Sequence, residues 1–321
     1  MKSYLFVTSS NDLLSKSSSG GAFGEIALSF IKEGGIVYGA TINYDNHCMV
    51  EHKRCSTLDD IYTILGSKYV MSNLIINSTF LSIFEDLMKG LKVLFVGVPC
   101  QISSIYSFLN SKNCPLDNFF TIRLICHGAP QVKYYKQYIN FLEKKYKSKI
   151  IHLNFRDKNS GWETYSFTAY FENGKKISSK NSKDPYLFLF LENYTLFSNC
   201  FSCESKRKTQ LGDIILGDFW NVDKTSLSSF KNEKGNSLVL ANSNKASFLL
   251  SSISNQLIEF NIDELDNYLR RYNPAFYSCV SFPKNYSRIV KLLNKKGIMS
   301  AYKRVKLLKL LDKIRQKVFK S

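Results

Sequence analysis

Two apolar segments near the middle of the chain each end at a cysteine, and this pattern constrains the fold more than any other. KVLFVGVPCQ contains a buried-type strand over 93–98, a sharp turn at Cys100 and then a helix. FFTIRLICHG has the same order, with a strand over 119–126 that ends at Cys126. Strands that alternate with helices predict an α/β sheet whose parallel strands place their carboxyl ends along one edge.

The rest of the sequence extends this pattern and then changes it. Strands over 4–9 and 35–42 flank a helix with Ser19 as its expected N-cap. After Lys149 the residues alternate as in antiparallel strands around an Asn-Gly turn. We therefore expect a mixed α/β fold: a partly parallel sheet with flanking helices, an added antiparallel region and a C-terminal basic helix. The expected divisions are a domain over 1–283, with an α/β part over 1–149 and a mixed part over 150–283, and a basic helical tail over 284–321.

The positive charge is concentrated at the C-terminal end. The chain carries 44 Lys and Arg against 26 Asp and Glu, a net charge of +18. Residues 284–321 contain thirteen Lys or Arg and one acid, Asp312, so subtracting their +12 leaves +6 for residues 1–283. A body this mildly basic does not indicate nucleic-acid binding. A hydrophobic content of 44% excludes an intrinsically disordered chain.

No secretory or membrane-spanning segment is expected. The apolar stretch near the N-terminus is too short for a signal peptide, and no window reaches about 18 uninterrupted apolar residues. We therefore expect a cytoplasmic protein, whose thiols stay reduced. Under those conditions its eight cysteines favour metal binding or catalysis over disulfides.

Four of the cysteines could bind one centre. Cys200 and Cys203 form a CxxC pair, which supplies half of a four-thiolate site. Cys100 and Cys126 follow strand ends, where a helix N-terminus is expected to lower the thiol pKa. If all four bind one 4Fe-4S cluster, their sulfurs should lie within about 6–7 Å of each other.

Two alternatives stay open for these cysteines. A single cysteine after a strand is often a buried apolar residue, and a CxxC pair also suits structural zinc. The remaining cysteines have no comparable context, and replacing Cys279 should leave bound iron unchanged. These are Cys48, Cys55, Cys114 and Cys279.

Several other residues could bind an anion or move a proton, and each has an ordinary structural alternative. Ser19, Gly20 and Gly21 open a helix, and their backbone amides could bind a phosphate. The alternative is that this turn is only the capped start of the helix. Further candidates are Ser67 and Lys68 in GSKYV, Arg156, Asp157, Lys158 and Trp162 in NFRDKNSGW, His127 beside Cys126, and Asp218 in GDFW. For Lys68 the alternative is a solvated surface lysine, and for the NFRDKNSGW segment it is an ordinary turn. For His127 it is a structural histidine, and for the two aromatic residues of GDFW it is a place in the core.

Taken in order, these segments resemble the coenzyme F420 hydrogenase/dehydrogenase beta-subunit family. The resemblance spans residues 17–241 and rests on SGGAF, GGIVYGA, GSKYV, VPCQ, ICHG, the FRDK–GW turn, the CxxC pair and GDFW. It implies an oxidoreductase that holds FAD and a 4Fe-4S cluster and moves electrons between them.

The resemblance also assigns residues. The cysteines that match the family pattern are Cys100, Cys126, Cys200 and Cys203. Ser19, Gly20 and Gly21 match the glycine turn near the flavin, and Lys68, Arg156, Lys158 and Asp218 match other motif positions. Together with Ser67, we expect Ser19, Gly20, Gly21, Lys68, Lys158 and Asp218 to bind the cofactor. We expect His127 to deliver a proton and Arg156 to bind an anion.

Two features depart from the family pattern. The chain has no cysteine before Cys48, whereas many relatives carry an N-terminal ferredoxin-like segment, and PCQISS has serines where relatives commonly have glycine. The first departure implies an external electron donor, either a ferredoxin-like protein or a reduced coenzyme, and weakens the link to the deazaflavin coenzyme. Short members of this kind accompany bacterial surface-polysaccharide genes, which suggests reduction of a small-molecule substrate in that setting.

A rival function is a zinc-stabilised binding protein without redox activity that docks on a membrane or partner through its tail. Residues 297–319 are expected to form one helix, whose apolar stripe contains Leu307, Leu311, Ile314 and Val318. Such a basic helix can make a peripheral contact with the inner face of the cell membrane, or pack on the body with its charges in solvent.

Overall fold

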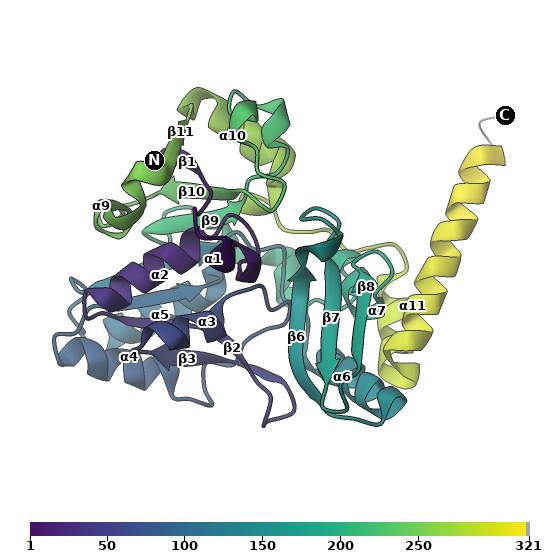
Figure 1. The fold of residues 1–321 in the computed structure, drawn as a ribbon. Coiled ribbons are helices and arrows are strands. Elements are labelled where there is room, and N and C mark those ends of the chain that lie inside the picture. The colour runs from purple at the N-terminus through teal and green to yellow at the C-terminus, as the bar shows by residue number, and fades with distance from the viewer. Residues whose placement is uncertain (319–321) are drawn as a thin grey trace.

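An eight-stranded mixed sheet forms the centre of the molecule (Figure 1). The structure, a computed structural model, describes residues 1–318. The strands lie in the order β11 (Leu257–Phe260), β1 (Lys2–Phe6), β10 (Ser237–Ala241), β9 (Ile214–Asp218), β5 (Phe119–Leu124), β4 (Val93–Gly97), β2 (Ile36–Asn43) and β3 (Met49–Cys55).

Five of these strands run in the same direction. β9, β5, β4 and β2 pair in parallel, and β1 shares their direction because both β1 and β9 are antiparallel to β10. The ends of these five strands form one side of the sheet, which we call the carboxyl edge. Proteins with open α/β sheets usually bind their ligands at this edge.

Helices cover both faces of the sheet because successive strand residues point to opposite sides. Leu94 of β4 belongs to the core under α2 (Ala22–Lys32), α3 (Leu58–Ile64) and α9 (Ala246–Leu250). The next residue, Phe95, belongs to the core under α4 (Thr79–Met88) and α5 (Pro99–Ser111), and α10 (Ile262–Tyr272) covers the same face further along.

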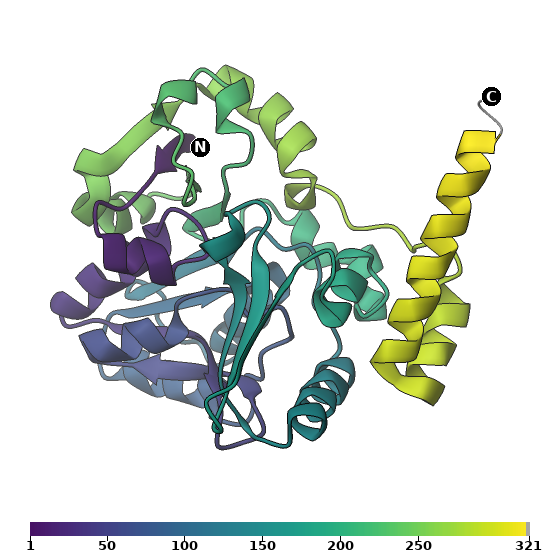
Figure 2. The same ribbon diagram turned by 45° about the vertical axis from the view of Figure 1, so that its right-hand side comes forward.

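A second, three-stranded antiparallel sheet stands beside the large one (Figures 1 and 2). It consists of β6 (Ile150–Asp157), β7 (Ser166–Phe171) and β8 (Lys176–Lys180), with β7 in the middle. Its core is shared with α6 (Val132–Tyr146), α7 (Pro185–Leu191) and α11 (Tyr286–Val318). The short helices α1 (Asn11–Lys16) and α8 (Glu204–Arg207) complete the described α-helices.

The fold class expected from the sequence is confirmed, with four local differences. α1 follows the first strand directly, and the sequence analysis predicted no helix there. α2 begins after Gly21, which has a left-handed φ of 90°, so the expectation of Ser19 as N-cap is wrong. β5 ends at Leu124, two residues before Cys126.

The fourth difference is at the C-terminus. α11 consists of two helical segments that are separated at Gly297, whose φ of 77° is not helical. The segment after Gly297 begins where the sequence predicted the helix over 297–319, whereas the segment over 286–296 was not predicted. The expected end of the helix at Phe319 lies outside the described residues. Within residues 1–318, no helix combines the length and apolarity that crossing a membrane would need.

Gly20 allows two segments to approach closely, and this explains its residue type without a ligand. A Cβ atom at this position would lie 2.2 Å from the carbonyl oxygen of Phe6 and 2.7 Å from the backbone nitrogen of Ser237. Both neighbours are strand backbone and cannot rotate away. An aspartate at Gly20 would therefore disturb the fold whatever its charge does to a cofactor.

We predict that Gly20→Ala lowers the free energy of unfolding by about 3 kcal/mol, the upper part of the usual range for overpacking. The control is Gly174→Ala, since a Cβ there meets no atom within 4 Å and only the left-handed φ of 79° resists it, at a cost of about 1 kcal/mol. Urea unfolding measures both variants. Equal losses would contradict the close approach.

Candidate functional site

Residues from both sheets meet at the carboxyl edge of the large sheet. β4 leads into Cys100, β5 leads towards Cys126 and β9 ends at Asp218, and these three strands are neighbours. The end of β6 brings Arg156 to the same place, where its Nη1 donates a hydrogen bond to Asp218 Oδ2 at 2.7 Å. The structure thus gathers one candidate from each of four strand ends.

The loop that carries the CxxC pair is held against the segment that follows β5. Pro130 and Leu196 form an isolated antiparallel bridge. The backbone amide of Ala129 donates to Cys200 Sγ at 3.4 Å, and Cys203 precedes α8 directly. These contacts bring the CxxC pair to the strand ends that carry the other two cysteines.

Burial opposes the ionisation of Cys126 and Cys100, and the neighbouring thiols act in the same direction. Burial raises the pKa of Cys126 to about 12; the charge of Lys206 opposes this rise and the other three thiols add to it. Burial also raises the pKa of Cys100, and the Cys203 and Cys200 thiols raise it further. The expectation of lowered pKa values is wrong: α6 begins well after Cys126, and burial outweighs the position of Cys100 in the first turn of α5.

Lys206 supplies a buried positive charge beside these thiols. The residue is 2% exposed, and its Nζ lies 3.4 Å from the carbonyl oxygen of His127 and 3.3 Å from that of Ser278. An ammonium buried with two carbonyl oxygens carries an uncompensated charge, which is costly. Ionised thiols at the neighbouring cysteines would supply the missing negative charge. Nothing in the sequence CESKR marks this lysine as buried, so sequence reasoning missed it.

A buried arginine of β5 holds the chain segment around Lys206 through hydrogen bonds to its backbone. Arg123 of β5 donates to the carbonyl oxygens of Lys206 at 3.0 Å and of Lys208 at 2.9 Å. Its guanidinium also lies over the ring of Phe276, at 5.5 Å from the centroid. Arg123 is thus a positioning residue for the segment that follows the CxxC pair.

A fifth cysteine lies beside the CxxC pair. Cys279 Sγ is 3.6 Å from the carbonyl oxygen of Cys203, a position that the sequence context of Cys279 did not indicate. Cys114, buried in the core beneath α5, is the better comparison. Among residues 1–318, no group of three or more His, Cys, Asp or Glu side chains is arranged to hold a metal ion. The spacing of about 6–7 Å between the four sulfurs stays a prediction.

His127 lies next to the cysteines and contacts aromatic residues. Its Nε2 is 2.7 Å from Asn193 Oδ1, and its ring packs edge-on against Phe190 with the centroids 5.3 Å apart. Burial lowers the pKa of His127, the Asn193 hydrogen bond opposes this, and the charge of Lys206 lowers it further. The imidazole is therefore neutral near pH 7.

The serine–glycine loop, residues 17–21, forms the second part of the site. Segments that are distant in the sequence form hydrogen bonds with its backbone carbonyl oxygens and serine hydroxyls. The contacts are Ser67 Oγ to Ser18 Oγ at 2.8 Å, Trp162 Nε1 to Ser18 O at 3.1 Å, Lys158 Nζ to Ser19 O at 3.3 Å, and Ser19 Oγ to Asn236 O at 2.5 Å. Burial lowers the pKa of Lys158 to about 8, and the nearby Arg156 charge acts in the same direction.

Arg156 is enclosed by aromatic rings. It is 5% exposed, and its Cζ lies 4.8 Å from the ring centroid of Tyr165, 5.4 Å from Trp220 and 6.0 Å from Trp162. The two tryptophans stack with centroids 4.5 Å apart. Among the described residues, Nε and Nη2 of Arg156 have no hydrogen-bond partner, while Nη1 binds Asp218. Two unused buried donors beside flat rings suit an anionic or planar ligand.

The two parts of the site are joined by packed aromatic side chains. The Tyr165 ring lies 6.3 Å from Tyr69, and Tyr69 lies 5.0 Å from Phe190. Phe190 in turn contacts His127, beside Cys126. A continuous apolar path therefore connects the enclosure of Arg156 with the cysteines.

Lys68 has a different environment from the one expected. Its Nζ donates to the carbonyl oxygens of Ile64 at 2.9 Å and Leu65 at 2.7 Å, at the C-terminal end of α3. Burial lowers the pKa of Lys68 to about 7. The structure shows a lysine that caps a helix, and a cofactor contact by Lys68 stays a prediction.

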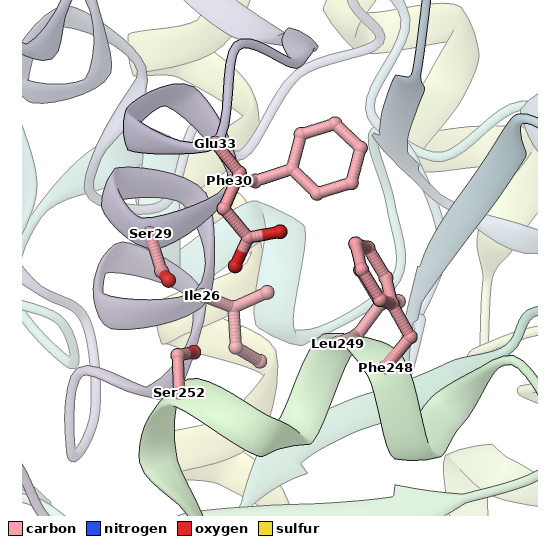
Figure 3. A pocket seen from close by; sticks show the side chains of 7 residues that line it. All are labelled: Ile26, Ser29, Phe30, Glu33, Phe248, Leu249 and Ser252. Carbon is pink, nitrogen blue, oxygen red and sulfur yellow. The ribbon is translucent and has the colours of Figure 1, made fainter.

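A hollow elsewhere in the molecule is unrelated to this site (Figure 3). It lies between α2 and α9 and contains about 180 Å³ of space that is continuous with solvent. This is less than the roughly 300–1,000 Å³ of ordinary ligand pockets. It includes none of the expected site residues, being lined by Ile26, Ser29, Phe30, Glu33, Phe248, Leu249 and Ser252.

Comparison with known proteins identifies the family. The family described as the C terminus of the coenzyme F420 hydrogenase/dehydrogenase beta subunit matches residues 90–264, more than half of the chain. The chain belongs to this family. The match includes all four candidate cysteines, Arg156 and Asp218, whereas the serine–glycine loop lies before it. A search of curated proteins gives no match.

A solved structure has the same fold. It is a chain of the F420-reducing NiFe hydrogenase complex from Methanosarcina barkeri, in a xenon derivative, with a TM-score of 0.53 and 17% identity. The similarity covers 95% of this chain and 91% of that chain. Membership of the F420 hydrogenase/dehydrogenase beta-subunit family places this chain among redox subunits of the hydrogenase and dehydrogenase type.

The ion pair between Arg156 and Asp218 yields a prediction. The two side chains are 4% and 18% exposed, so Asp218→Asn leaves the guanidinium buried without its counter-charge and should cost about 3 kcal/mol of unfolding free energy. The control is Asp266→Asn, which breaks an exposed pair with Arg270 and should change stability little. Urea unfolding distinguishes them, and similar midpoints for both variants would show that the buried pair does not hold the sheets together.

Proposed function

We propose that this family member is an iron–sulfur flavoprotein oxidoreductase that passes electrons between a 4Fe-4S cluster and FAD. What supports the proposal is that Cys100 and Cys126 follow neighbouring strands and that the CxxC loop is held against the segment after β5, beside a buried lysine. The enclosure of Arg156, joined to the cysteines by aromatic rings, supports a second cofactor close to the first.

The donor set fits an iron–sulfur cluster. Cys100, Cys126, Cys200 and Cys203 would supply four thiolates, the usual ligands of a 4Fe-4S cluster. The Ala129 amide already donates to Cys200 Sγ, and hydrogen bonds to sulfur help to set the reduction potential. Lys206 would offset part of the negative charge of the thiolates, which favours their ionisation despite burial.

The second part of the site fits a flavin. The first amides of α2 and the two unused donors of Arg156 suit an anionic group, and the Trp162–Trp220 stack suits a flat ring. When bound, FAD supplies exchange between two-electron hydride transfer and one-electron transfer. Ser19, Gly20, Gly21, Ser67, Lys158 and Asp218 would line or support this site, with Lys68 at its margin.

The remaining residues have roles that do not require redox chemistry of their own. The rings of Tyr165, Tyr69 and Phe190 exclude water between the two parts of the site. His127, neutral near pH 7, can hold a proton on one ring nitrogen while Nε2 contacts Asn193. Arg156 would bind an anionic part of the ligand.

The electrons would come from an external donor, a ferredoxin-like protein or a reduced coenzyme. The structurally similar chain belongs to a multi-component hydrogenase complex, which supports a protein partner here. The substrate would be a small molecule, and its connection with surface-polysaccharide synthesis is inferred from the resemblance described above.

Anaerobic purification tests the proposal through iron, sulfide, zinc and flavin analysis. We expect a brown-yellow protein with about four iron and four sulfide per chain and one FAD. Cys203→Ser should lose most of the iron, whereas Cys114→Ser, in a core away from the site, should keep it. A colourless protein with zinc would favour the rival function, and iron without flavin would remove FAD from the proposal.

Lys206→Met tests the role of the buried charge. Removing a positive charge makes it harder to add an electron nearby, so the reduction potential of the cluster should fall by about 60 mV or more, since 59 mV corresponds to about 1.4 kcal/mol for one electron. Arg207→Met on the same helix, which is exposed, is the matched control. Redox titration followed by electron paramagnetic resonance measures both, and equal potentials would show that Lys206 does not act on the cluster.

A further inference from the structure

The distal part of α11 stands clear of both sheets. Figures 1 and 2 show this part extending away from the body in two views. Four large apolar side chains on it are exposed to solvent. They are Leu307 at 46%, Leu310 at 55%, Leu311 at 42% and Ile314 at 50%. The side chain of Val318, expected on the same stripe, lies outside the described residues.

These four side chains occupy one face of the helix. At 3.6 residues per turn they fall within an arc of roughly 100°. We call this face the outer stripe. A row of exposed leucine and isoleucine of this kind is more than the scattered apolar residues that any surface carries.

The outer stripe is not the face by which α11 packs on the body. Ile298, Ala301 and Val305 are nearly fully buried in the core with α6 and α7. By the same helical geometry their centre lies roughly 160° around the helix from the centre of the outer stripe. We call the face with Ile298, Ala301 and Val305 the inner face; through it the helix packs on the body, as one of the two expectations for the tail proposed. The outer stripe has no partner among the described residues.

Basic side chains border the outer stripe on both sides. Lys306 and Lys313 lie along one border, and Arg304 and Arg315 along the other. Lys309 points to the opposite side, where it pairs with Glu192 of the body. Over residues 303–315 there are six Lys or Arg against one acid, Asp312.

We propose that the outer stripe of α11 is a docking surface for an anionic lipid membrane. An apolar face with lysine and arginine along both borders lets the apolar side chains enter the acyl boundary while the charged ends reach the headgroups. Each basic residue near an anionic surface adds about 1 kcal/mol. The helix is convex and offers no groove, which suits a flat, deformable surface.

Charge argues against a second copy of the chain as the occupant. Two such helices packed stripe to stripe would bring the four bordering cations of each copy against those of the other. Like charges that flank a helix seam oppose association. A lipid surface carries the opposite charge and has no such penalty.

Co-sedimentation of the full chain with vesicles tests the proposal. A chain ending near Pro283 is unsuitable, because it would lose Ile289, Leu293 and Ile298 from the core. Vesicles of phosphatidylcholine alone are compared with vesicles containing about one quarter phosphatidylglycerol, at about 0.05 M and about 0.5 M salt. We expect binding to the anionic vesicles only, weakened at high salt.

Two variants separate the apolar and charged contributions. Leu307→Gln combined with Leu311→Gln and Ile314→Gln should reduce binding at least about fivefold, and Lys306→Gln combined with Lys313→Gln should reduce it about as much at low salt. The matched controls are Leu81→Gln with Met88→Gln on α4, and Lys144→Gln with Lys180→Gln, all exposed positions. These controls should bind as the original chain does.

Three results would overturn the proposal. They are binding that ignores anionic lipid, binding by the stripe variant equal to that of the original chain, and a concentration-dependent dimer that the stripe variant abolishes. Iron and flavin contents are measured on the same samples. Because the stripe variant should keep both cofactors, failure of membrane docking is distinguishable from failure of the proposed redox function.

Discussion

The hydrogen-bonded ion pair between Arg156 and Asp218 joins the two sheets at the carboxyl edge of the large sheet. Arg156 belongs to β6 of the small sheet, and Asp218 ends β9 of the large one. Burying a charge is tolerable only with a partner, so this contact fixes how the small sheet meets the carboxyl edge. The aromatic enclosure, the serine–glycine loop and the route towards the cysteines all depend on that placement.

The cysteine part of the site depends on a different constraint, the parallel pairing of β4, β5 and β9. Parallel neighbours bring residues that are far apart in sequence to one edge without any contact between their side chains. Arg123 and the Pro130–Leu196 bridge then bring the CxxC loop to that edge. Burial raises the pKa of the Cys126 thiol there, and the charge of Lys206 opposes this effect.

Local pattern predicted most of the elements, because their apolar residues repeat with the period of the structure they form. The strands that precede Cys100 and Cys126 were expected over 93–98 and 119–126, within two residues of the bounds that the structure shows. α1 was missed because six mostly polar residues carry little periodic signal. Ser19 was misassigned because its hydroxyl bonds to Asn236, more than two hundred residues away, and no local pattern contains that contact.

The site was predictable in its residue types and much less so in their surroundings. Strand ends and the CxxC spacing indicated the four cysteines, but the burial of Lys206 and the position of Cys279 arise only when distant segments pack together. The same holds for the stack of Trp162 on Trp220, which joins residues 58 positions apart in the sequence. Contacts between distant segments determine these features, and local sequence patterns do not reveal such contacts.

The packing of the inner face of α11 fixes the direction in which the distal part of the helix extends. Ile298, Ala301 and Val305 clamp it to α6 and α7, and α7 leads within ten residues to Cys200. Beyond the clamp, residues 306–318 extend about 20 Å at 1.5 Å per residue. The helix is therefore a rigid spacer: whatever its tip touches is held at a set distance and angle from the cysteine loop.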